Sequence, residues 1–221
     1  MTEEALNSRF QVRALLIREG YAPSFSLPAG IPLYSLPESV FQSVCDTKTP
    51  QGIAAVTEIP SPEEMNGRML LALDGLQDPG NMGTIIRTAD AAGFGGIILS
   101  PDCADIFSPK VIRATMGSIF RVSFSFVSSL PARLSGLRDR GYSVISSQLD
   151  GDPFYERIPV PCPLVLVIGN EGNGISPEVK AVATHRFRLP MVGGAESLNA
   201  AVAAGIMMYD LLRENLPVHS G

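Results

Sequence analysis

Short apolar runs alternate with helix-like stretches from Arg68 to the C-terminal region. The pattern predicts strands at 69–73, 96–99, 122–127, 142–146, 164–168 and 187–189, and helices at 82–92, 109–116, 130–140, 177–182 and 198–213. Fully apolar strands between helices are typical of a mostly parallel sheet with helices on both faces. We therefore expect an α/β fold for this part of the chain.

The first 66 residues have a different texture. The pattern here predicts helices over 6–19 and 37–44, strands over 31–34 and 52–56, and a loop over 21–30. The segment 61–67 is rich in Pro, Glu, Asn and Gly, as linkers and turns are. We expect a domain boundary there, with a small N-terminal domain over 1–66 and a larger one over 67–221.

Composition narrows the class of protein. The chain of 221 residues is 45% hydrophobic and 18% charged, which argues against disorder. Its net charge of −5 argues against coating of nucleic acid by bulk attraction. The cysteines Cys45, Cys103 and Cys162 are far apart, so neither a disulfide framework nor a zinc site is expected. The acidic N-terminus and the lack of a long apolar run predict a cytoplasmic protein with no signal peptide or membrane span.

Ligand sites in α/β sheets lie beyond the carboxyl ends of strands, and three glycine-containing turns occupy such places. The first, 74–84, opens a helix that carries Arg87, and such a turn can offer free N–H groups to an anion. The alternative is a helix capped by Asn81 with a solvated Arg87. These two residues are six positions apart, so acting together requires Asn81 to lie at or before the start of the helix.

The second turn, 169–176, has three glycines that allow a ligand to approach the backbone closely. A tight strand-to-helix turn is the alternative, but it gives no reason for a carboxylate at Glu171. The third turn, 189–199, leads into an alanine-rich helix that Ser197 or Asn199 can cap. The small residues of that helix fit either a tightly packed core or a subunit interface.

Other motifs are absent, and one charge feature stands out. The sequence has no dinucleotide-binding fingerprint, phosphate loop or nucleophile elbow, and its two histidines are distant from the three turns. Between Asp105 and Asp139 there is no acidic residue, whereas five basic residues lie in this segment: Lys110, Arg113, Arg121, Arg133 and Arg138. It is either an RNA-binding surface or a chance cluster on a solvated face.

The three turns, in this order, resemble the SpoU-type (TrmH-like) ribose 2′-O-methyltransferases of the SPOUT superfamily. The resemblance covers residues 68–215 and is carried by Asp-Pro-Gly-Asn-Met-Gly-Thr-Ile-Ile-Arg-Thr-Ala-Asp at 78–90, Gly-Asn-Glu-Gly-Asn-Gly-Ile at 169–175, and Leu-Pro-Met to Glu-Ser-Leu-Asn at 189–199. The stretch 110–122 is also similar to the family. The N-terminal segment, with 46–56, resembles a shortened form of the family's ribosomal-protein-like RNA-binding domain.

The resemblance implies a deep C-terminal trefoil knot, S-adenosylmethionine as cofactor, a homodimer and an RNA substrate. It implies these active-site residues: Asn81, Arg87, Glu171, Ser197 and Asn199. It implies these cofactor-binding residues: Ile168, Gly169, Leu189, Met191, Ser197 and Leu198. Structured ribosomal RNA is the expected substrate and transfer RNA the alternative.

The chemistry expected is methyl transfer to a ribose 2′-hydroxyl without a metal. Because arginine stays protonated, Arg87 is expected to stabilise a developing alkoxide or grip a phosphate rather than act as a base. Asn81 would orient Arg87, Glu171 would pair with Arg87 or receive the proton, and Ser197 and Asn199 would hold the loop or the ribose. A non-catalytic RNA-binding module and a small-molecule methyltransferase are the alternatives.

Overall fold

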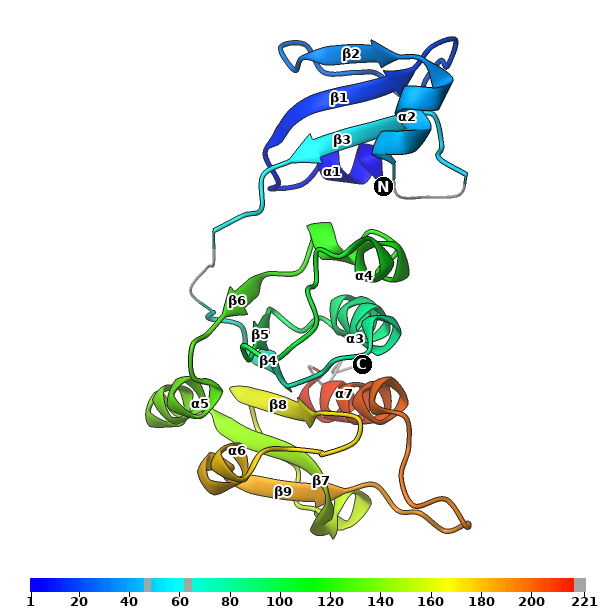
Figure 1. The fold of residues 1–221 in the computed structure, drawn as a ribbon. Helices are drawn as coiled ribbons and strands as arrows, with labels where there is room; N and C mark the ends of the chain where they lie inside the picture. Colours follow the sequence, from blue (N-terminus) through cyan, green and yellow to red (C-terminus); the bar gives the residue numbers. More distant parts are fainter. Residues whose placement is uncertain (46–48, 62–64, 217–221) are drawn as a thin grey trace, which may run out of the picture. The chain divides into compact units, whose positions relative to one another are not determined.

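The computed structural model describes residues 1–45, 49–61 and 65–216. The chain divides into two compact units, Met1–Ser61 and Pro62–Gly221. Each unit is described by itself (Figure 1).

The N-terminal unit is a three-stranded sheet with two short helices. Its elements are α1 (Thr2–Leu6), β1 (Val12–Arg18), β2 (Leu33–Leu36), α2 (Glu38–Val44) and β3 (Ile53–Thr57), and the strand order is β2-β1-β3. The helix predicted over 6–19 was wrong, because most of that stretch is the central strand β1. The strands β2 and β3 pair with the backbone of Val12–Arg18 from either side. Side chains alternate between the two faces of a strand, and Leu15 lies on the buried face, where it is only 1% exposed. An apolar run of this length fits the period of a helix or that of a strand, and pairing with two neighbouring strands makes it a strand here.

The second unit is built on a six-stranded sheet in which every pairing is parallel. Its strands are β4 (Met69–Asp74), β5 (Ile97–Leu99), β6 (Phe124–Phe126), β7 (Ser143–Pro153), β8 (Leu164–Gly169) and β9 (His185–Arg188). The strand order is β6-β5-β4-β8-β7-β9, so β4 and β8 lie side by side at the centre. The prediction of a mostly parallel sheet is confirmed.

Helices cover both faces of this sheet (Figure 1). The helices α3 (Pro79–Ala91), α4 (Pro109–Ala114) and α7 (Ala200–Asn215) pack on one face, and α5 (Leu130–Asp139) and α6 (Pro177–Val182) pack on the other. Alternate residues of the central strands serve the two cores: Leu71 and Leu73 face α3 and α7, whereas Leu70 and Ala72 face α5. Burial on both faces explains why the central strands are apolar throughout.

Two boundaries of this unit differ from the predicted ones by three residues or more. Helix α3 begins at Pro79, three residues before the predicted start, because the Asp78 carboxylate accepts a hydrogen bond from the Asn81 N–H at 2.7 Å and caps the helix. Strand β7 continues past the predicted end at Ser146 to Pro153, through a register irregularity in its pairing with β9.

A buried arginine ties the C-terminal helix to the segment that precedes β8. The Arg157 side chain is 3% exposed and its guanidinium lies 2.8 Å from Asp210 and 2.9 Å from Glu214, both on α7. It also lies over the Phe154 ring, 3.6 Å from the ring centre. Desolvation by itself raises the pKa of Asp210, but hydrogen bonds and charge from Arg157 and Arg213 outweigh it and hold that pKa below its usual value.

We expect Arg157→Ala to lower the free energy of unfolding by about 3–5 kcal/mol, because it leaves two acidic side chains without their buried partner. The measurement is urea denaturation at neutral pH. Arg138→Ala is the matched control, since Arg138 is 43% exposed and lies 3.9 Å from Asp139, a pair worth about 1 kcal/mol or less. Equal losses in the two variants would contradict this account of the cluster.

Candidate active site

The first two turns meet at the carboxyl ends of the central strands. Asp74, the last residue of β4, is the register partner of Gly169, the last residue of β8. The Asp74 carboxylate accepts a hydrogen bond from the Ser176 N–H at 2.7 Å, and the Asn170 amide donates to the Gly75 carbonyl at 2.7 Å. A Cβ atom at Gly169 would lie 2.3 Å from the carbonyl carbon of Gly174, so only glycine allows this loop to fold back over the strand.

The Glu171 carboxylate joins the second turn to the first. It accepts hydrogen bonds from the Gln77 N–H at 3.2 Å, the Asp78 N–H at 3.0 Å and the Asn81 side-chain amide at 3.0 Å. Partial desolvation raises the pKa of Glu171, but these hydrogen bonds outweigh it, and the pKa is lower than usual. Glu171 is therefore ionised at neutral pH and holds two loops together.

The third turn is joined to the other two through Asn81. The Asn199 side-chain amide donates to the Asn81 oxygen at 2.8 Å. The Asn199 oxygen accepts from the N–H groups of Ala201 at 2.9 Å and Val202 at 3.2 Å, and so caps α7. A continuous hydrogen-bonded chain, which we call the loop clasp, thus runs Asn199–Asn81–Glu171 and joins three turns that are distant in the sequence.

Arg87 stands apart from the loop clasp. The condition set by the sequence is not met, because Asn81 lies inside the first turn of α3 rather than at or before its start, so the two side chains leave the helix on different sides. Within the described part of this one chain, Asn81 contacts Glu171 and Asn199 rather than Arg87, and the pairing of Glu171 with Arg87 and the orientation of Arg87 by Asn81 stay predictions. Among the described residues the exposed Arg87 side chain makes no hydrogen bond or ion pair.

The predicted cofactor-binding residues comprise a buried set, which we call the wall, and a more exposed set, which we call the rim. Ile168, Gly169 and Leu189 are buried at the ends of β8 and β9, whereas Met191 is partly buried and Ser197 and Leu198 are exposed. The backbone of residues 190–198 makes no hydrogen bond to any part of the chain that the structure describes. Unpaired backbone donors and acceptors beside an apolar wall suit a ligand with polar edges and a flat ring.

The basic residues of the predicted RNA-binding segment differ in their surroundings. Lys110 and Arg113 are exposed on α4. Arg121 forms an ion pair with Asp90 of α3 at 2.7 Å, so it has a structural contact whether or not it meets RNA.

Sequence reasoning missed Asp78 and Asn170. Asp78 caps α3, and Asn170 closes the second turn by accepting hydrogen bonds from the N–H groups of Gly172 and Asn173, both at 2.9 Å. The signals were an acidic residue directly before a proline at a helix start, and an asparagine at the start of a glycine-rich turn.

Neither a cluster of metal-ligating side chains nor a membrane-spanning helix occurs among the described residues. Within these ranges, no three His, Cys, Asp or Glu side chains are grouped to hold a metal ion. No helix in the part of the chain placed by the structure is long and apolar enough to span a membrane.

Comparison with known proteins identifies relatives over nearly the whole chain. The model of the SpoU rRNA Methylase family matches residues 68–209, and that of the MRM3-like substrate binding domain matches residues 1–55. The 23S rRNA (guanosine(2553)-2′-O)-methyltransferase RlmP of Bacillus subtilis is 38% identical over 96% of this chain and 85% of that protein.

Solved structures agree with the sequence relatives. A putative RNA methyltransferase of the TrmH family from Porphyromonas gingivalis has a TM-score of 0.87 at 38% identity, over 96% of this chain and 86% of that one. An AdoMet-bound rRNA methyltransferase from Sinorhizobium meliloti has a TM-score of 0.86 at 32% identity, over 98% and 85%. The family model, the relatives and the joined turns agree: this chain belongs to the SpoU rRNA methylase family.

Proposed function

We propose that the chain transfers the methyl group of S-adenosylmethionine to a ribose 2′-hydroxyl of ribosomal RNA. The observation that carries this proposal is the loop clasp, which brings the three family turns to one edge of the sheet. The ribosomal RNA methyltransferases among the relatives support the choice of substrate. An enzyme for this RNA works where ribosomes are, which agrees with the predicted cytoplasmic location.

The residues at the second and third turns fit the cofactor. The buried side chains of Ile168 and Leu189 would contact its adenine, and the unpaired backbone of residues 190–198 would bond to its polar edges, with Met191, Ser197 and Leu198 at the rim. The family's trefoil knot would be formed by these same turns. When bound, the cofactor supplies an electrophilic methyl group on a sulfonium, so the protein has to orient the acceptor and stabilise charge.

Arg87 is the group that meets the developing charge. As a permanent cation it would stabilise the 2′-oxygen as its proton leaves, or hold the adjacent phosphate. Glu171 is not the proton acceptor in this scheme, because its oxygens are occupied by three hydrogen bonds and its pKa is lowered. Asn81 and Asn199 are positioning residues that act through the loops.

A homodimer is part of the proposal. Helix α7 has an apolar stripe in which Val202 is 50% exposed, Tyr209 is 51% exposed and Ile206 between them is partly buried. These residues lie on one side of the helix, at spacings of four and three. A second copy of the chain would cover this stripe, as the small residues of the helix already suggest.

The substrate test is incubation of the full chain with labelled S-adenosylmethionine and, in parallel, with ribosomal RNA and transfer RNA from cells that lack this modification. We expect one 2′-O-methylated nucleotide in ribosomal RNA and none in transfer RNA. Label found only in transfer RNA would contradict the substrate, and no label in either would contradict the enzymatic function.

We expect Arg87→Ala to reduce kcat by about 100-fold or more, because a charge that stabilises the transition state is removed. S-adenosylmethionine binding, measured by calorimetry, should stay within about twofold of wild type because Arg87 has no contact with the loop clasp. Lys180→Ala, on α6 and outside the basic segment 106–138, serves as the control for general charge loss. Turnover preserved in Arg87→Ala would remove Arg87 from the mechanism.

Glu171→Gln should lower stability in a pH-dependent way. Because the folded-state pKa of Glu171 is lowered, its stabilising effect is present above the ordinary pKa of a glutamate and is lost as the pH falls through the folded-state value. The difference in unfolding free energy between wild type and variant, measured from pH 7 down to pH 3, should therefore shrink. A difference that stays constant over this range would show that the ionised carboxylate does not hold the loops.

A further inference from the structure

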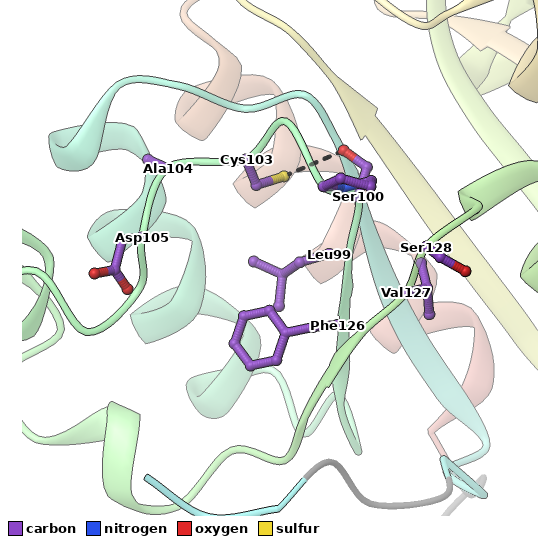
Figure 2. Close-up of a pocket in the computed structure, with 9 residues that line it drawn as sticks. Leu99, Ser100, Cys103, Ala104, Asp105, Phe126, Val127 and Ser128 are labelled. Atoms are coloured by element: carbon purple, nitrogen blue, oxygen red, sulfur yellow. Dashed lines mark hydrogen bonds between the residues drawn. The ribbon is translucent and has the colours of Figure 1, made fainter.

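A pocket lies at the carboxyl ends of β5 and β6, apart from the three turns of the loop clasp. Its volume is about 510 Å³. Figure 2 shows residues that line it. Leu99 and Phe126, the last residues of β5 and β6, line it with Val127, and polar groups come from Ser100, Asp105 and Ser128.

An aromatic ring lines this pocket. The Phe126 side chain is 46% exposed, whereas Leu99 beside it is 1% exposed. The Phe107 ring packs against the Phe126 ring with centroids 6.2 Å apart and so supports it from one side. A half-exposed, supported ring next to an apolar wall suits the stacking of a flat ligand.

Charge favours a neutral ring in the pocket and phosphates beside it. The Asp105 carboxylate lines the pocket and would repel an anion. Beyond it, residues 106–138 contain no acid, and Lys110 is exposed on α4 only three positions after Phe107. An apolar pocket whose lining residues Asp105 and Phe126 bracket a stretch of chain with basic residues and no acid matches a nucleic acid, whose bases are flat and neutral and whose backbone is anionic.

The pocket is bonded to the first turn of the active site. The Ser100 hydroxyl accepts a hydrogen bond from the Gly75 N–H at 2.8 Å, and the Ala104 N–H donates to the Leu76 carbonyl at 2.8 Å. The Cys103 thiol donates to the Leu73 carbonyl at 3.3 Å. The loop that forms the pocket and the loop that carries Asn81 therefore hold each other in place.

We propose that this pocket binds an unpaired base of the substrate RNA, stacked on Phe126, with the neighbouring phosphates on the segment 106–138. The inference rests on the proposed function, since it takes RNA as the substrate. The carboxyl ends of β5 and β6 would then contribute to recognition of the RNA substrate, whereas the second and third turns would bind the cofactor. Sequence-specific recognition of RNA commonly uses unstacked bases held on aromatic side chains.

The test compares RNA methylation by the full-length wild type, Phe126→Ala and Phe126→Tyr. We expect Phe126→Ala to raise KM for ribosomal RNA roughly tenfold, the loss typical of one stacked base, with kcat and the Kd for S-adenosylmethionine within about twofold. Phe126→Tyr should restore KM because it keeps the ring. Tyr155→Ala is the matched control, an aromatic residue 58% exposed outside the pocket, and should leave KM unchanged.

Ser128→Trp keeps the test valid if Phe126→Ala fails to fold. It fills an exposed position in the pocket wall without removing any packing, and should also raise KM at constant kcat. Ultraviolet cross-linking of wild type to unmodified ribosomal RNA should label the tryptic peptide Val122–Arg133, which contains Phe126.

An unchanged KM in both Phe126→Ala and Ser128→Trp, or cross-links only outside 122–133, would overturn the inference while methylation by wild type continues. A fall in kcat together with the rise in KM in the folded variants would also overturn it, since a change in both constants points to a structural role. Absence of methylation by wild type would instead contradict the proposed function itself.

Discussion

Three loops of this protein depend on one asparagine side chain. Asn81 donates to the Glu171 carboxylate and accepts from the Asn199 amide, so its donor and its acceptor each hold a different loop. Both ends of the chain are anchored in turn, Glu171 by backbone N–H groups of the first turn and Asn199 by the first N–H groups of α7. The side-chain amide carries its donor and its acceptor on two separate atoms, so it can hold one loop with each, whereas neither an ionised aspartate nor a leucine at position 81 can do so.

This arrangement separates positioning from chemistry. The predicted active-site residues divide into a bonded set, Asn81, Glu171 and Asn199, which shapes the loops, and two exposed residues, Arg87 and Ser197, whose side chains make no hydrogen bond in the part of the chain that the structure describes. A charged side chain with no protein partner can interact with RNA at full strength. The Glu171 carboxylate already accepts three hydrogen bonds and has little capacity left for a ligand. The pocket at β5 and β6 extends the same principle, since its loop is bonded to the first turn through Gly75 and Leu76.

The sequence predicts the second unit better than the first. In the second unit, strands buried on both faces give apolar runs that only a parallel sheet explains, and each predicted strand there has a counterpart. In the first unit, Val12–Arg18 mixes apolar residues with arginines at both ends, and the run fits a helix until its two neighbouring strands are known. The start of α3 was placed late because Pro79 and Gly80 are poor helix formers, although Pro is well suited to the first position after a capping Asp.

The sequence predicts which residues form the site but not which of them contact one another. The family motifs identify Asn81, Glu171 and Asn199, yet only the folded chain brings Asn199 to Asn81 across 118 positions of sequence. Local spacing says that Asn81 and Arg87 diverge, but it does not say which partner replaces Arg87. Contacts between distant turns depend on the strand order β4-β8-β7-β9, which periodicity does not determine.

We propose that the loop clasp shapes the binding site for the methyl donor. This role is tested by calorimetric titration of S-adenosylmethionine into wild type, Asn81→Ala and the control Asn7→Ala, an exposed asparagine of the N-terminal unit. We expect saturable binding to wild type and to the control, and binding weakened about tenfold or more in Asn81→Ala, since the turns lose their common link. Equal affinity in all three proteins, or no binding to wild type, would contradict it.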